Sequence, residues 1–123
     1  MNMKKKEEKL PILCFESGRA LRLWLEKNHT SSNGIWVQIY KKNSEVQSIT
    51  FEELLDEGLC FGWSESLRHK ADGRSYLQRF TPRKIKGTTS KRNLAHIERL
   101  IKEKKMHPSG LRSLGITNRG ENE

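Results

Sequence analysis

The sequence is poor in cysteine, and its histidines are scattered. Its two cysteines, Cys14 and Cys60, form no CxxC pair, and none of the four histidines lies at a zinc-ligand spacing from them. We therefore expect two free thiols in or near the core and no metal site. Because no base is adjacent to Cys60 in the sequence, a buried structural thiol is preferred over a nucleophile there.

Long apolar runs are also missing from the sequence. No stretch approaches the roughly 20 residues that a membrane-spanning helix needs. The apolar piece at residues 10–15 is too short for the hydrophobic segment of a signal peptide. We expect no transmembrane segment and a cytoplasmic protein.

Aromatic residues make up only 7% of the 123 residues, while hydrophobic (33%) and charged (32%) residues are nearly balanced. This composition predicts one domain with a small core and a highly charged surface. The net charge of +9 comes from one block: residues 66–105 carry thirteen basic and three acidic side chains, whereas residues 1–65 sum to −1. Such a block predicts attraction to phosphates, anionic lipid or acidic proteins.

Residues 49–63 carry the clearest structural signal. Thr50 and Glu53 have the spacing of a capping box at the start of a helix. The buried face of that helix is expected to hold Phe51, Leu54, Leu55, Gly58 and Leu59. The apolar run Cys60-Phe61-Gly62-Trp63 is expected in the core, with Gly62 at the junction of helix and strand in a positive-φ conformation.

The other elements follow from periodicity and turn signals. We predict helices at residues 19–28 and 91–104 and from Pro108, a strand at 35–41, and a hairpin over 63–80. The fold class is α+β, a small antiparallel sheet of about three strands with three to four helices packed on one face. The globular domain is expected to span residues 15–114, after a flexible or loosely docked lead-in (1–14) and before a disordered tail (115–123).

Three blocks of the sequence resemble a family signature. They are residues 48–63; residues 76–84 followed by Ser90-Lys91-Arg92-Asn93; and Leu100-Ile101 with Met106, Pro108 and Gly110-Leu111. The order and spacing of Cys60-Phe61-Gly62-Trp63 and the stretch at 77–83 are the specific part of the match. On these blocks the chain resembles the bacteriocin-protection family, also called YdeI or OmpD-associated.

The resemblance implies a small non-enzymatic bacterial protein linked to tolerance of bacteriocins or cationic antimicrobial peptides. It implies no catalytic residue and no cofactor, and an unknown protein or peptide as partner. Two positions depart from the family pattern. Ser64-Glu65-Ser66 replaces an Ile-Asp-Gly-like turn, and Thr89 stands where members carry tryptophan. If these positions form a ligand site, a different ligand or none is expected.

Four residues are candidates for a ligand site: Trp63, Glu65, Arg79 and Arg83. Strand periodicity places Glu65 on one face with Trp63, Leu67 and His69, where a carboxylate beside aromatic rings could titrate or bind a cation. The alternative is an ion pair between Glu65 and a hairpin arginine. Arg79 could form a fork for phosphate or carboxylate, or could be a solvated strand arginine.

The basic block has two interpretations, a solvated face or a patch that binds a phosphate backbone with Tyr76 and Phe80 available for stacking. Besides Arg79 and Arg83, the patch would contain Arg68, Lys70, Arg74, Lys84, Lys86, Lys91 and Arg92. No nucleic-acid motif is recognised, so sequence-specific readout is not expected. Non-specific nucleic-acid binding is therefore the alternative function, and an enzyme that uses Glu65 and Cys60 is a weaker third.

Overall fold

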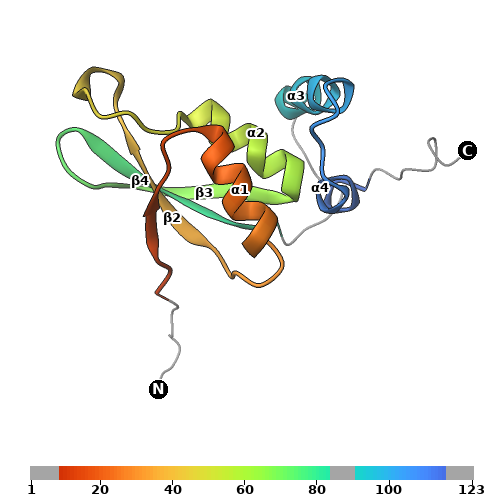
Figure 1. Cartoon of the computed structure of the whole chain (residues 1–123), viewed down its shortest axis with the longest axis horizontal. Helices are drawn as coiled ribbons and strands as arrows, with labels where there is room; N and C mark the ends of the chain where they lie inside the picture. The colour runs from red at the N-terminus through yellow and green to blue at the C-terminus, as the bar shows by residue number, and fades with distance from the viewer. Residues whose placement is uncertain (1–8, 84–90, 116–123) are drawn as a thin grey trace, which may run out of the picture.

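The computed structural model describes residues 9–83 and 91–115. These residues form a four-stranded sheet with helices α1 and α2 against one face, while α3 and α4 lie beside α2 (Figure 1). The predicted α+β class and single small domain are confirmed. The lead-in before residue 9 and the predicted tail after Gly115 lie outside the described residues.

The elements begin and end close to their predicted positions. The strands are β1 (Ile12–Cys14), β2 (Ile35–Tyr40), β3 (Trp63–Lys70) and β4 (Ser75–Pro82). The helices are α1 (Gly18–Asn28), α2 (Phe51–Phe61), α3 (Lys91–Lys102) and α4 (Pro108–Ser113), with a 3-10 turn η1 (Lys42–Ser44). None of the helices in the described part of the chain is long and apolar enough to cross a membrane.

The sheet has the strand order β1-β2-β4-β3. The predicted hairpin is present, because β3 and β4 pair antiparallel, and β2 pairs antiparallel with β4 on its other side. The prediction of about three antiparallel strands holds for β2, β4 and β3, but it missed β1, which adds a fourth, parallel edge strand with Leu13 opposite Val37. A three-residue strand is too short to show a clear alternation in the sequence.

One face of the sheet is buried under α1 and α2. Ile35, Val37 and Ile39 of β2 point to this face and are at most 3% exposed, as their alternation with polar positions predicts. They share one apolar core with Leu21 and Leu25 of α1 and with the buried residues of α2. Burial of this apolar surface is the main stabilising contribution to the domain.

The helix α2 begins and ends as predicted. Thr50 and Glu53 form the complete capping box, with each side chain accepting the other residue's backbone N–H at 3.0–3.1 Å. On its inner face Leu54, Gly58 and Leu59 are buried, whereas Phe51 and Leu55 lie at the edge and are half-buried. Gly62 ends the helix with φ of +81°, the left-handed conformation that glycine adopts without strain.

The short helix α4 docks on the C-terminal end of α2. The backbone N–H of His107 donates to the carbonyl of Cys60 at 2.9 Å, and Ser109 Oγ donates to the carbonyl of Phe61 at 3.0 Å. The His107 ring also stacks on Phe61 with 4.6 Å between ring centroids. These contacts use carbonyls that the end of a helix otherwise leaves unpaired.

A bulge in β3 changes which side chains share a face. Glu65 lies opposite Phe80 but Arg68 lies opposite Gln78, so three residues of β3 advance against two of β4. An extra residue of this kind shifts the alternation of the strand after it. Glu65 therefore shares the helix-covered face with Trp63, as predicted, but the prediction was wrong for His69, which lies opposite Leu77 on the other face.

Candidate functional site

A cleft of about 430 Å³ lies between α1, α2 and the end of α3. Its lining is mostly charged: Arg19, Arg22, Lys104 and Lys105 contribute cations, and Glu53, Asp56 and Glu57 contribute carboxylates. The carboxylates are on successive turns of α2 because the helix carries its acidic residues on the side opposite the core. The size is within the range of pockets that hold small ligands or side chains of a partner.

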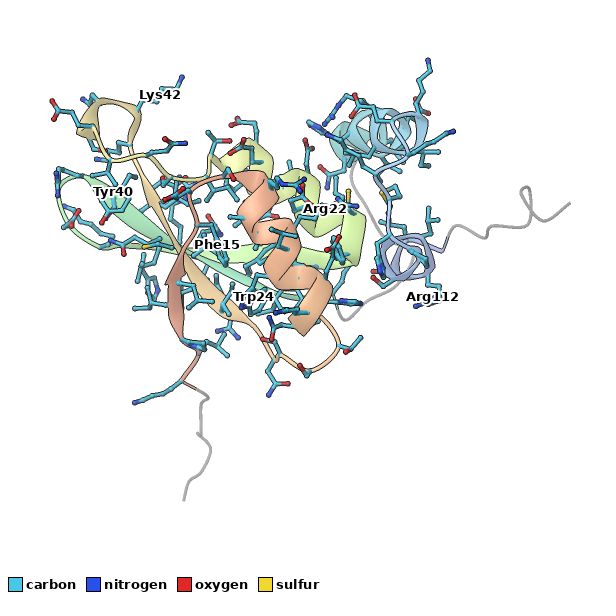
Figure 2. The ribbon with its side chains drawn as sticks, viewed as in Figure 1. Phe15, Arg22, Trp24, Tyr40, Lys42 and Arg112 are labelled. Atoms are coloured by element: carbon cyan, nitrogen blue, oxygen red, sulfur yellow. The ribbon has the colours of Figure 1, made fainter. Side chains whose placement is uncertain are left out.

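Arg22 joins the three walls of the cleft. Its Nη1 donates to Glu57 Oε1 at 3.0 Å and its Nη2 donates to the carbonyl of Lys105 at 2.6 Å. The guanidinium carbon also lies 5.2 Å from the centroid of the Phe61 ring. Figure 2 shows Arg22 on the side of α1 that faces the later helices, far from Lys42 at the other end of the molecule. A guanidinium with this many partners is held in one position.

The carboxylates of α2 are held by different partners. Arg99 Nη2 donates to both oxygens of Asp56 at 2.8 Å, which fastens α3 to α2. The Glu57 side chain is only 13% exposed, and its burial raises the carboxyl pKa against the opposing effect of Arg22. Glu53 accepts a backbone hydrogen bond in the capping box and forms no ion pair within the described residues.

Two cations of the cleft remain available. Within residues 9–83 and 91–115, Arg19 and Lys104 take part in none of the ion pairs, and Lys105 has only a 3.7 Å contact with Glu103. The Asp56 and Glu57 charges are already matched by arginines, so the charge left for a ligand is mainly positive. The cleft can accept a carboxylate or another anionic group at these cations, with Glu53 as the one carboxylate beside them.

The thiol nearest to this site is not activated. Cys60 lies beneath the cleft and is fully buried, and this burial raises its pKa to about 11 against the opposing hydrogen bond from Arg22. A thiol with this pKa stays protonated at neutral pH, whereas a nucleophilic cysteine acts as the thiolate. The interpretation of Cys60 as a structural thiol agrees with this geometry.

The structure does not gather the four predicted ligand-site residues around one open site. Trp63 is 2% exposed and packs its ring against Trp24 at 5.8 Å and Phe80 at 5.1 Å between centroids, so it is part of the core. Glu65 is half-buried on the same face and forms none of the ion pairs of the described residues. Register pairs Arg79 with Trp36 on the opposite face of the sheet.

Arg83 follows β4 directly and lies near the end of α2. Its backbone N–H donates to the carbonyl of Gly62 at 2.8 Å, and its side-chain Nε is buried with no hydrogen-bond partner among the described residues. The residue therefore helps to hold β4 beside the turn at Gly62.

The predicted polyanion patch is divided by the sheet. Arg68 turns to the helix-covered side, where its guanidinium stacks 4.1 Å from the Tyr76 ring centroid, and Lys70 is in register with the same tyrosine. Arg74 lies at the hairpin turn, 6.0 Å from the Tyr40 ring centroid. Lys84 and Lys86 lie outside the described residues, and Lys91 and Arg92 open α3.

Sequence reasoning missed the residues that build the cleft. Helix periodicity places Arg22 on the outer face of its helix, but its pairing with Glu57 spans 35 positions and that of Arg99 with Asp56 spans 43. Helix periodicity shows which residues leave the core face, but it does not show which helix lies beside them. The acidic residues at 52–57 suit the positive end of the helix dipole, and no local signal in the sequence assigns them partners.

A comparison with protein families shows which family the chain belongs to. The model of the family described as "Domain of unknown function (DUF8412)" matches residues 13–113, and the chain belongs to this family. No curated protein and no solved structure matches the chain. The family description assigns no activity, so a function has to be inferred from the geometry and from the resemblance described above.

Proposed function

We propose that the protein is a small, non-enzymatic, cytoplasmic binding protein that acts in tolerance of bacteriocins or cationic antimicrobial peptides. The role in tolerance comes from the resemblance to the bacteriocin-protection family. The observation that carries the binding function is the charged cleft, with Arg19 and Lys104 free of ion pairs in the described residues. The partner is an acidic segment of a protein or peptide.

The overall charge decides the sign of the partner. A protein of net charge +9 repels a cationic antimicrobial peptide at long range, so direct capture of that peptide is disfavoured. An acidic partner is attracted, and its carboxylates can pair with Arg19 and Lys104 at the cleft. Tolerance would then arise through the acidic partner, with the antimicrobial peptide remaining unbound by this protein.

Binding is favoured over catalysis by the groups near the cleft. The carboxylates of Asp56 and Glu57 are engaged by Arg99 and Arg22, and the thiol of Cys60 is held protonated. These interactions keep the groups in fixed positions as ion pairs and leave no activated nucleophile in the cleft. The arrangement supports a rigid recognition surface.

The binding function is tested with a fluorescein-labelled glutamate-rich peptide and fluorescence anisotropy. We expect binding that weakens as salt rises and that falls at least about tenfold in the double variant Arg19→Gln/Lys104→Gln. Lys41→Gln/Lys42→Gln is the matched control, because it removes the same charge from exposed positions at the other end of the molecule (Figure 2). Equal loss in both double variants would show general charge attraction and refute the cleft.

The role in tolerance is tested in bacteria from which the gene for this protein has been deleted, exposed to a cationic antimicrobial peptide. The wild-type protein and the Lys41/Lys42 control are expected to restore survival, and the Arg19/Lys104 variant is not. Survival that is independent of the protein itself would reject the role in tolerance but would leave peptide binding in vitro intact.

A second candidate function is non-specific nucleic-acid binding. It is favoured by the block of net charge +10 at residues 66–105, of which His69, Lys70 and Arg74 are exposed around the hairpin turn. Phosphate-driven binding predicts retention on heparin at low salt and release at moderate salt. Folded protein that passes through heparin at low salt would remove this candidate.

A further inference from the structure

The face of the sheet opposite α1 and α2 carries a continuous row of side chains, which we call the open face. Register places Ile12, Trp36 and Arg79 side by side across β1, β2 and β4. The neighbouring row contains Leu77 and, through the bulge, His69. None of these side chains belongs to the buried core, and Ile12 is 55% exposed.

Aromatic rings form a platform at the centre of the open face. The Trp36 ring reaches across β4 and stacks on His69, with 4.7 Å between ring centroids and 28° between ring planes. The Arg79 guanidinium carbon lies 5.9 Å from the centroid of Trp36. Trp36 is half-buried and His69 is exposed, so the platform is reachable from solvent within the part of the chain that the structure describes.

The strands of the open face present positive charge and no negative charge. β1, β2 and β4 contain no acidic residue, and Glu65, the one carboxylate of β3, is opposite Phe80 on the helix-covered face. Arg79 lies on the platform, and Arg74 lies at the hairpin end, 6.0 Å from the Tyr40 ring centroid. The carboxylate of Asp72 at this hairpin end accepts hydrogen bonds from the backbone N–H and the hydroxyl of Ser75. An aromatic platform with nearby cations and no carboxylate on its strands is complementary to unpaired bases on a phosphate backbone.

We propose that the open face binds single-stranded nucleic acid, with a base stacked at Trp36 and His69 and the backbone phosphates at Arg79 and Arg74. The proposal rests on the second candidate function and gives it a site and a ligand class. Stacking on aromatic side chains tolerates any base, so binding without sequence preference is expected. A flat sheet has no protruding element to enter a groove, which favours single strands over duplexes.

The test measures anisotropy of a labelled oligothymidylate at low and moderate salt. We expect Trp36→Ala to weaken binding at least about tenfold and Trp36→Phe, which keeps a ring, to weaken it much less. Quenching of tryptophan fluorescence on binding should disappear in Trp36→Phe, since Trp63 is buried in the core and Trp24 of α1 packs against it on the helix-covered side. Wild-type affinity in folded Trp36→Ala would overturn the proposal.

A pair of arginine variants tests which face of the sheet binds the nucleic acid. This test remains valid even if the tryptophan variants fail to fold. Arg79→Gln removes a charge from the open face and is expected to weaken binding at least about fivefold and to reduce the salt dependence. Arg68→Gln removes the same charge from the same sheet on the helix-covered side and should have a clearly smaller effect. Equal effects of the two variants would reject the open face as the binding site.

Heparin separates this proposal from the function on which it rests, because heparin has phosphate-like charge but no bases. If the protein is retained on heparin and Trp36→Ala binds the oligonucleotide as the wild type does, general polyanion binding is supported and stacking is rejected. If the protein binds neither heparin nor the oligonucleotide at low salt, both the stacking proposal and non-specific nucleic-acid binding are rejected. Stacking is supported if the Trp36→Ala variant stays on heparin as the wild type does but loses the oligonucleotide.

Discussion

In the cleft on the helix-covered side of the molecule, Asp56 and Glu57 are paired across elements, whereas the strands of the open face present cations and no carboxylate. Asp56 and Glu57 in the cleft are each held by an arginine from another helix. On the open face, Arg79 has a ring as its neighbour and no carboxylate. The comparison teaches that ion pairs join the helices, while charge without an opposite partner marks the surfaces that are available for ligands.

The core under the helices and the apolar residues of the open face should differ most in their effect on stability. Leu54→Ala removes a fully buried side chain and is expected to lower the free energy of unfolding by about 2–5 kcal/mol. Ile12→Ala, at a position that is 55% exposed, is expected to lower it by less than about 1 kcal/mol. Urea denaturation of both variants checks this, and equal losses would mean that the open face is part of the core.

The junction at Gly62 is expected to show the next largest effect. Gly62→Val forces a β-branched residue to φ of +81° and places its Cβ about 2.9 Å from the Cβ of Ser113 in α4. We expect a loss of about 2–3 kcal/mol, because strain and a clash act together. Gly73→Val, in the open hairpin turn where an added Cβ meets nothing within 4 Å, is the control. A normal melting temperature of Gly62→Val would contradict this interpretation of the junction.

Removal of an arginine from each side tests the role of pairing directly. Arg22→Met breaks the bonds to Glu57 and to the carbonyl of Lys105, and we expect a loss of about 1–2 kcal/mol. Arg79→Met on the open face should change stability by no more than about 0.5 kcal/mol. A double-mutant cycle of Arg22 with Glu57 isolates the pair, and a coupling of zero would show that the pair does not stabilise the helices.

The smallest effect is expected from acidification. Burial lowers the pKa of His107 below its usual value, and the positive charges of Arg22 and Arg112 and the neighbouring His29 act in the same direction. The unfolded chain therefore binds a proton at a higher pH than the folded protein does. Stability should be unaffected above pH 7 and should fall as the pH drops below about 6.5.

A substitution at the cap of α4 identifies the group responsible. His107 Nδ1 accepts the backbone N–H of Ser109 at 3.1 Å, and asparagine at this position can accept the same bond without titrating. Melting temperatures of the wild type and His107→Asn are compared at pH 7.5 and 5.5. A difference of the same size in both proteins would assign the pH dependence to other groups.

The sequence predicted the local features well where one residue or one short spacing controls them. The capping box of Thr50 and Glu53, the positive φ of Gly62 and the burial of Leu54 all follow from positions within one helix and its ends. The hairpin at 63–80 followed from two alternating segments and an Asp-Gly turn. These features depend on near neighbours, which the sequence shows directly.

Both candidate binding surfaces depend on contacts that no local pattern contains. The cleft requires α3 to lie beside α2, which is fixed by Arg99 and Asp56 across 43 positions. The open face requires the bulge in β3, because only the extra residue there turns His69 toward Trp36. Periodicity in the sequence therefore determined which residues lie outside the core. Which of those residues meet was decided by the packing of the helices and the register of the strands, because packing and register depend on the whole folded chain.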